Sequence, residues 1–135
     1  MSHFLMPLVG SAPTGWALRN ERTGLTICSV LFTAFDSRAR RRGLLGKGSL
    51  SRDAAVILAP CSAVHTWFMR FPIDVLFVDE GGLVRKVCPR VRPWRFAVDL
   101  RAFATVELAA GLALEADTRP GDRLSVSKSD ATQES

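Results

Sequence analysis

The chain has 135 residues, 47% of them hydrophobic, which is enough for one domain with a sizeable apolar core and too apolar for disorder over most of its length. Its net charge of +5 arises from 18 basic residues, 15 of them arginine, a composition that favours a solvated basic surface over a nucleic-acid footprint. No stretch approaches the ~20 apolar residues that span a bilayer, and the start MSHFLMPLVG has no basic leader, so we expect a cytoplasmic protein without a membrane span.

The first half of the chain predicts a hairpin, a short helix and a buried strand. Residues 16–32 (WALRNERTGLTICSVLF) favour two strands joined at NERTG, where Gly24 provides the permissive backbone. Residues 36–50 (DSRARRRGLLGKGSL) favour a short helix that begins at an aspartate or serine cap and ends among glycines. Residues 54–60 (AAVILAP) predict an apolar strand closed by proline.

The second half predicts mostly short antiparallel strands. Residues 64–71 (VHTWFMRF) and 74–91 (DVLFVDEGGLVRKVCPRV) favour three successive strands, with turns at RFPI and at the glycine pair 81–82. Residues 92–100 are expected to be irregular because of Pro93. Residues 104–118 predict a strand through Leu108 followed by a helix from about 111 to 118, before the turn RPGD and a closing strand DRLSV.

These segments amount to about seven strands and two short helices, with nearly all connections short enough for antiparallel neighbours. We therefore predict a mainly antiparallel β fold, a small sandwich or partly closed barrel with two short helices, which some criteria would place in the α+β class. Residues 1–127 are expected to form one domain. The polar residues 128–135 are expected to form a disordered tail.

The three cysteines contain no CxxC pair, which argues against a disulfide framework or a zinc knuckle. Cys61 and His65 would lie about 13 Å apart along a strand, too far to share one ion or to act as nucleophile and base. We expect no metal and no cofactor.

His65 and Asp74 are the polar residues that stand out in the apolar centre of the chain. Alternation along a strand would place His65 on one face with Trp67, Met69 and Phe71. Pairing about the RFPI turn would set Asp74 opposite Met69 and His65 nearer Val78, so the two would not form a catalytic dyad. A buried carboxylate must be satisfied, so Asp74 is expected to accept N–H bonds from the turn or to pair with Arg70.

Four stretches together resemble the domain-of-unknown-function family 192 (DUF192) over about residues 26–127: RARRRGLLGKGSL, VHTWFMRFPIDVLFVDEGGLV, VELAAGLA and RPGDRLSV. The resemblance implies a small β-rich fold with minor helices, and the family has no established reaction. Many relatives look exported, with a signal peptide; the start of this sequence departs from that pattern, so we do not expect the resemblance to carry over an envelope location. The family pattern falls here on Arg42, Gly43, Leu44, His65, Thr66, Met69, Pro72, Ile73, Asp74, Glu107, Gly111, Gly121 and Asp122.

Three functions compete on this sequence. The favoured one is a non-catalytic binding or accessory module for an unidentified small ligand or an acidic protein segment. Its ligand-binding residues are predicted to be His65, Thr66, Trp67, Met69 and Arg70, within an apolar wall that Phe71 and Trp94 extend and that Arg90, Arg92 and Arg95 surround.

The alternative is a hydrolase-type enzyme in which His65 acts with Asp74 or Glu107, and this needs those groups within about 3 Å of one another or of a shared water. The sequence leaves open whether any reaction is catalysed and leans against it. Nucleic-acid binding through RARRR and VRKVCPRVRPWR is the least favoured function, because three lysines and a small net charge make a weak electrostatic footprint.

Overall fold

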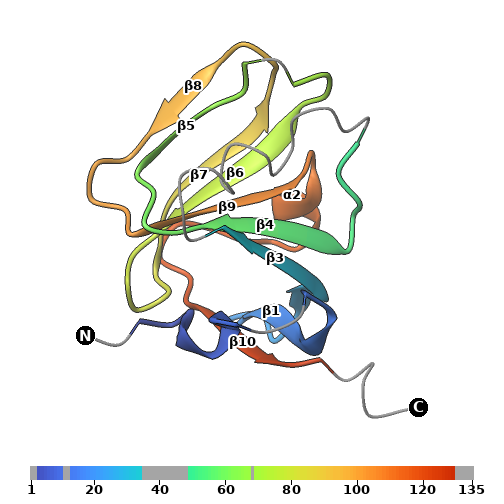
Figure 1. Ribbon diagram of the computed structural model, residues 1–135, viewed down its shortest axis with the longest axis vertical. Helices are drawn as coiled ribbons and strands as arrows, with labels where there is room; N and C mark the ends of the chain where they lie inside the picture. Colours follow the sequence, from blue (N-terminus) through green and yellow to red (C-terminus); the bar gives the residue numbers. More distant parts are fainter. Residues whose placement is uncertain (1–2, 11–12, 35–48, 68, 130–135) are drawn as a thin grey trace.

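The computed structural model of the chain describes residues 3–10, 13–34, 49–67 and 69–129. Within these residues the chain is built mainly of strands, arranged in three open sheets with little helix (Figure 1). The predicted mainly β fold is therefore confirmed. No helix in the described part of the chain is long and apolar enough to cross a membrane.

A three-stranded sheet joins the two ends of the fold. The predicted hairpin is present, because Asn20 N–H donates to Leu25 O (3.0 Å) and Gly24 takes a φ of 74° in the turn. The closing strand then pairs antiparallel with the first, from Trp16 opposite Lys128 to Asn20 opposite Leu124. The sheet contains β1 (Trp16–Asn20), β2 (Thr26–Cys28) and β10 (Leu124–Lys128), in the order β10-β1-β2.

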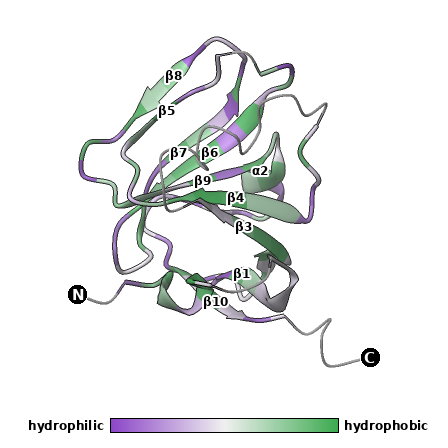
Figure 2. Cartoon of the chain, viewed as in Figure 1, coloured by the Kyte–Doolittle hydropathy of each residue, from purple (hydrophilic) through white to green (hydrophobic). Residues whose placement is uncertain are grey.

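A five-stranded sheet forms the centre of the molecule, in the order β3-β4-β9-β6-β7. Every residue of its three inner strands is buried, as expected of apolar runs covered on both faces, and β4 is drawn in shades of green in Figure 2. The glycine pair 81–82 turns β6 into β7, as predicted. The strands are β3 (Val30–Ala34), β4 (Ala54–Leu58), β6 (Ile73–Val78), β7 (Val84–Val91) and β9 (Ala104–Ala109).

Two features of this sheet depart from the sequence prediction. The predicted strand LTICSVLF divides at Ser29, because Cys28 pairs with Leu18 in the first sheet and Val30 pairs with Ala54 in the second. In addition, β3 runs parallel to β4, so the expectation of almost exclusively antiparallel neighbours is wrong at this edge. A parallel pair needs a connection of a dozen or more residues, and residues 35–53 separate the two strands in the sequence.

A two-stranded ribbon, β5 (Ala63–His65) paired with β8 (Phe96–Val98), makes the third sheet. The predicted strand 64–71 is wrong beyond His65, and its predicted hairpin with β6 does not form, since β6 pairs with β7 and β9 instead. The stretch 92–100 is also not wholly irregular, because β8 lies within it. Pro93 itself stays outside the strands, as expected.

Helical structure is limited in the described residues to single turns. These are the 3-10 helices η1 (Met6–Leu8) and η2 (Pro13–Gly15) and the helix α2 (Leu112–Glu115), which is shorter than the predicted 111–118. The predicted helix in residues 36–50 falls almost entirely on 35–48, which lie outside the described residues.

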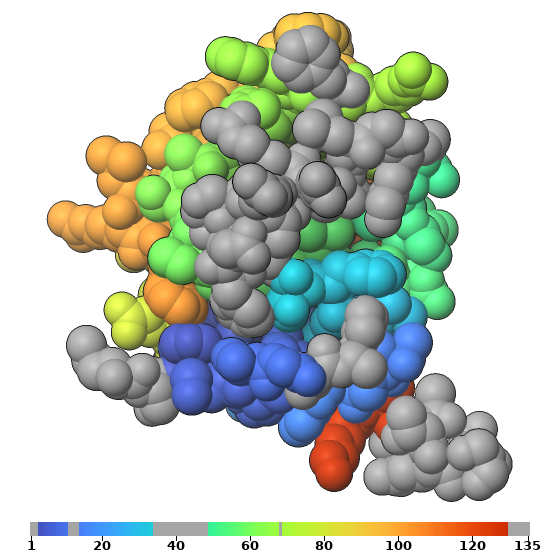
Figure 3. Space-filling view, viewed as in Figure 1, coloured from blue at the N-terminus to red at the C-terminus, as the bar shows by residue number. Residues whose placement is uncertain are grey.

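The three sheets stack as layers, with one apolar core on each face of the five-stranded sheet. The first core, between that sheet and the three-stranded sheet, includes Leu5, Leu18, Ile57, Leu76 and Leu124. The second core, under the ribbon, includes Val56, Leu58, Ile73, Val75, Phe77 and Ala97. Figure 3 shows the N-terminal residues and the red end of β10 together at the lower end of the molecule, consistent with the β1–β10 pairing.

The C-terminal strand reaches Lys128, and the following Ser129 N–H donates to Gly15 O (3.1 Å). The remainder of the predicted tail, residues 130–135, lies outside the described residues.

The predicted RPGD turn is fixed by Asp122, as expected of a turn residue. Its carboxylate accepts hydrogen bonds from Arg22 Nε (2.6 Å), Asn20 Nδ2 (2.9 Å) and the Arg119 N–H (2.8 Å). The Arg22 guanidinium is the main reason that the pKa of Asp122 falls from 3.8 to about 2. This network ties the β1–β2 hairpin to the turn that precedes β10.

Candidate functional site

Asp74 lies on β6 and is fully buried. Its Oδ1 accepts hydrogen bonds from the Arg90 N–H (2.8 Å) and the Gly111 N–H (3.1 Å), and its Oδ2 accepts one from the Ala113 N–H (2.8 Å). The expectation that Asp74 accepts backbone N–H bonds is confirmed. The expected donors are wrong, because they come from the end of β7 and the start of α2 instead of the RFPI turn or Arg70.

Glu107 lies on β9, the middle strand of the five-stranded sheet, and its side chain is only 9% exposed. It sits between Val56 of β4 and Val75 of β6, on the face that carries the second core. Among the described residues it makes no hydrogen bond or ion pair, and burial alone raises its pKa from 4.5 to about 8. Glu107 is therefore mainly protonated at neutral pH.

The two carboxyl groups point to opposite faces of one sheet. Asp74 pairs with Leu108 and the next residue, Val75, pairs with Glu107, so strand alternation directs Asp74 toward the first core and Glu107 toward the second. The sheet itself separates the two candidate partners of a catalytic histidine.

His65 lies on the outer side of the ribbon, directly opposite Phe96. The neighbouring pair Val64 and Ala97 packs into the second core, so alternation turns His65 and Phe96 away from it. The His65 ring stacks on Trp67 at 4.7 Å and 30°, and its Nδ1 is buried without a hydrogen-bond partner among the described residues. His65 bonds to neither Asp74 nor Glu107 in this structure.

Thr66 is 1% exposed and connects the ribbon to the loop before β8. Its Oγ1 donates to Arg92 O (2.6 Å) and accepts from the Arg95 N–H (2.8 Å), while its own N–H donates to Arg95 O (2.9 Å). The Thr66 carbonyl accepts the Trp94 N–H (3.0 Å). One buried threonine therefore fixes the backbone of residues 92–95.

The loop held by Thr66 presents large aromatic side chains to solvent. Trp94 is 56% exposed, Phe96 is 64% exposed, and Trp67 beside them is 47% exposed. Trp94 also has a φ of 64°, a left-handed conformation that costs a bulky residue of order 1–3 kcal/mol. We call the group formed by these aromatics and the nearby exposed arginines the ribbon surface: His65, Trp67, Arg70, Arg92, Trp94, Arg95 and Phe96.

The predicted ligand-binding residues divide between this surface and the interior. Trp67 and Arg70 are exposed, and His65 is half-buried on the ribbon, whereas Thr66 is buried and Met69 packs into the second core. Sequence reasoning missed Phe96, the most exposed of the three aromatics. The short β-favouring run FAV, directly after PWR, was the signal for a strand that would place it opposite His65.

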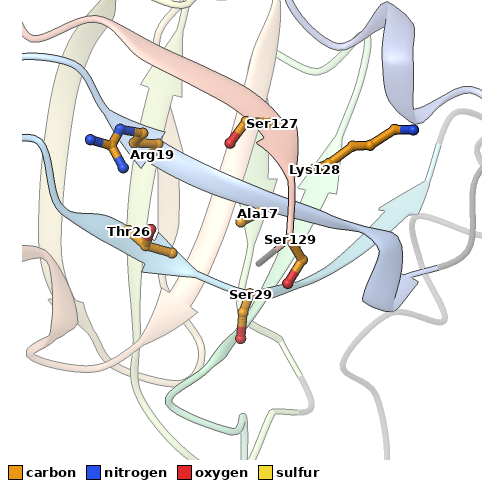
Figure 4. Close-up of a pocket in the computed structure, with 7 residues that line it drawn as sticks. All are labelled: Ala17, Arg19, Thr26, Ser29, Ser127, Lys128 and Ser129. Atoms are coloured by element: carbon orange, nitrogen blue, oxygen red, sulfur yellow. The ribbon is translucent and has the colours of Figure 1, made fainter. Parts of the chain in front are cut away.

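A hollow of about 450 Å³ lies on the outer face of the three-stranded sheet. Ala17 lies in its middle, with hydroxyl groups of Ser29, Ser127 and Ser129 around it, and Figure 4 shows Arg19 and Lys128 pointing away from one another at its two ends. Because its two cations do not converge, the hollow lacks the arrangement that would hold one anion.

Thiol and metal chemistry have little support in the described residues. Cys61 donates its thiol hydrogen to Ala63 O (3.2 Å), and burial raises the pKa of Cys28 to about 12. No three histidine, cysteine, aspartate or glutamate side chains within the described ranges gather closely enough to hold a metal ion.

Comparison with solved structures shows that the fold is shared. A protein from Sinorhizobium meliloti 1021, described as a candidate transcription regulator, superposes with a TM-score of 0.74 at 20% identity, covering 86% of this chain and 96% of the other. A protein of unknown function from Novosphingobium aromaticivorans DSM 12444 gives a TM-score of 0.70 at 19% identity, covering 82% of both chains. Identities this low establish the fold alone.

Comparison with curated proteins found no match. The family model of DUF192, described as uncharacterized ACR, matches residues 20–126 and so covers most of the chain. The match includes both buried carboxylates and the ribbon surface. The chain belongs to the DUF192 family.

Proposed function

We propose that this domain is a non-catalytic binding module that holds an acidic segment of a partner protein on the ribbon surface. The observation that carries the proposal is Trp94, a large aromatic side chain exposed to solvent on a left-handed backbone, whose N–H donates a hydrogen bond to the Thr66 carbonyl. Strained backbone that the surrounding structure maintains is typical of functional sites.

The composition of the ribbon surface supports a particular partner chemistry. Exposed tryptophan and arginine side chains are the residues most enriched where proteins bind one another. Three exposed arginines, Arg70, Arg92 and Arg95, are near the aromatics in the sequence, and there is no aspartate or glutamate in residues 61–73 or 88–98. An extended segment with alternating acidic and apolar residues would complement both the charge and the rings.

The hydrolase alternative loses support from the geometry. Both carboxylate oxygens of Asp74 accept backbone N–H groups on the side of the first core. Glu107 points into the second core beneath the ribbon. Neither is positioned to orient His65 on the outer side of the ribbon. The predicted cytoplasmic location stays a prediction.

Nucleic acid is the competing ligand class, because bases also stack on exposed aromatics beside arginines. The Sinorhizobium structure is described as a candidate transcription regulator, which is a description of that protein. An acidic peptide is favoured here because the aromatic surface is short and the described arginines beside it are few. The experiment therefore includes both ligands.

The test is fluorescence anisotropy of the full chain with a labelled short peptide of alternating glutamate and leucine, a lysine–leucine peptide and single-stranded oligothymidylate. The acidic peptide is expected to bind, and Trp94→Gly should weaken it about tenfold or more, since aromatic anchors dominate such interfaces. Glycine accepts a positive φ, so Trp94→Gly should not lower the free energy of unfolding.

The matched control is Leu114→Ala, which removes another exposed apolar side chain, 80% exposed on α2, without touching the ribbon surface. It should bind the acidic peptide like the wild type. Equal binding by Trp94→Gly and the wild type, or a preference for oligothymidylate, would contradict the proposal.

A further inference from the structure

The outer edge of β8 has no partner strand in the described part of the chain. Of the three sheets there, the ribbon of β5 and β8 alone has two strands, and β8 pairs only with β5. Figure 1 shows β8 at the margin of the molecule, with β5 on its inner side. A two-stranded sheet is marginal in water, and a third strand stabilises it.

Hydrogen bonds at the two ends of the ribbon show which of its residue pairs are bonded. At one end, the Asp99 N–H donates to Ser62 O (2.9 Å). At the other end, the Thr66 N–H donates to Arg95 O (2.9 Å). Both bonds continue the register of β5 with β8. Bonded and unbonded pairs alternate along an antiparallel ladder, so the first and the third of the three pairs between these ends are unbonded.

Phe96 and Val98 belong to those unbonded pairs, so their N–H and carbonyl groups point outward, away from β5. Lys86 on β7 supports this direction, because its ammonium donates to Val98 O (3.2 Å). Among the described residues, no other group bonds to the outward N–H and carbonyl groups of Phe96 and Val98. A row of outward backbone donors and acceptors is what an added strand binds.

The charges beside this edge are basic. Lys86 and Arg95 are exposed there, whereas Asp99 is already paired with Arg85 (Nε to Oδ2, 2.9 Å). A lysine at a sheet edge ordinarily opposes pairing with other chains. Lys86 does so at Val98 O, and a carboxylate on an incoming strand would draw its ammonium away from that carbonyl. A second copy of the chain would instead bring like charges together, which disfavours it as the occupant.

We propose that the acidic partner segment binds as a third strand of the ribbon, antiparallel to β8. This binding mode rests on the proposed function and specifies how the ribbon surface holds its partner. An apolar residue of the segment lies opposite Phe96, beside its exposed ring, and exchanges two backbone hydrogen bonds with it. The alternate, acidic residues face inward. Lys86 approaches from that side, because it lies opposite Phe77 of the second core.

The experiment measures fluorescence anisotropy of the full chain with three forms of the labelled glutamate–leucine peptide. One form is unmodified, one carries a methyl group on every leucine backbone nitrogen, and one carries it on every glutamate backbone nitrogen. A strand bonded at one edge uses the N–H groups of one alternate set of residues. The leucine-methylated peptide should therefore bind at least about tenfold more weakly than the unmodified one, and the glutamate-methylated peptide should bind within about twofold of it.

The methylated peptides distinguish failure of this binding mode from failure of the proposed function. If the unmodified peptide binds and the two methylated forms bind alike, the proposed function stands and strand addition is overturned. Weaker binding of the glutamate-methylated form would overturn the antiparallel arrangement. No binding of the unmodified peptide would overturn both proposals. Sedimentation velocity identifies the remaining occupant, because a dimer of the chain that the peptide dissociates would assign the β8 edge to a second copy and overturn the proposal.

A substitution tests the charge at the edge. Lys86→Met should reduce the preference for the glutamate–leucine peptide over a glutamine–leucine peptide by about threefold. Lys128→Met is the matched control, because it removes the same charge from an exposed position on β10, outside the ribbon surface. It should leave the preference unchanged. An unchanged preference in Lys86→Met, or an equal reduction in both variants, would overturn the selection of acidic segments by Lys86.

Discussion

Asp74 and Glu107 are buried on adjacent strands of one sheet, yet their chemical situations are opposite. Asp74 accepts three backbone N–H groups, whereas Glu107 has no partner among the described residues and is largely protonated. The difference lies in where unpaired N–H groups occur. Asp74 faces the end of β7 and the start of α2, where backbone N–H groups have no acceptor within the sheet or the helix. Glu107 faces mid-strand neighbours whose N–H groups already bond to adjacent strands.

Removing the satisfied carboxylate should have the largest effect. Asp74→Ala leaves the N–H groups of Arg90, Gly111 and Ala113 buried without an acceptor. We expect the free energy of unfolding to fall by about 3–5 kcal/mol. Urea denaturation followed by circular dichroism measures it, and a loss below about 1 kcal/mol would show that water replaces the carboxylate.

Removing the Glu107 carboxyl, which has no partner among the described residues, should raise the free energy of unfolding at neutral pH. The folded pKa of Glu107, about 8, lies above its ordinary 4.5, so its contribution to stability is complete below pH 4.5 and is lost as pH rises to 8. Glu107→Gln removes this dependence. Its free energy of unfolding, relative to that of the wild type, should therefore be higher by about 3 kcal/mol at pH 7 than at acidic pH. Parallel urea titrations of both proteins at pH 5 and pH 9 test this, and identical pH profiles would contradict the raised pKa.

Removing a neutral buried group that bonds to the backbone should lower the free energy of unfolding, but by less than removing the Asp74 carboxylate does. Thr66→Val keeps the shape but removes the hydroxyl that bonds to Arg92 O and the Arg95 N–H. We expect a loss of about 1–2 kcal/mol. Hydrogen exchange of residues 92–96 should accelerate selectively, and uniform acceleration across the domain would instead point to global destabilisation.

An exposed charged pair should matter least. Arg52 and Glu115 form an ion pair in which both side chains are more than half exposed. Arg52→Ala is expected to change the free energy of unfolding by less than about 0.5 kcal/mol, and added salt should erase the difference. A larger loss in thermal unfolding would indicate that Arg52 contributes packing besides charge.

The sequence predicted the fold class, the family, the β1–β2 and β6–β7 hairpins and the backbone role of Asp74, because these depend on local patterns. It did not predict the ribbon, since alternation in residues 64–71 shows which residues share a face but not which strand lies alongside. The structural role of Thr66 could not be predicted, because its hydrogen-bond partners in residues 92–95 lie far away in the chain. The unpartnered state of Glu107 could not be predicted either, because it depends on the strands at both sides.

The pairing of β1 with β10 has a consequence for the order in which the protein can form. Trp16 lies opposite Lys128, so the first strand of the chain completes its sheet with the last one described. During synthesis the hairpin of β1 and β2 emerges from the ribosome long before its third strand exists, and a two-stranded hairpin is marginal by itself. Until residue 128 has left the exit tunnel, the backbone edge of β1 has no pairing strand, and Leu124, which packs with Leu18 in the first core, is not in place.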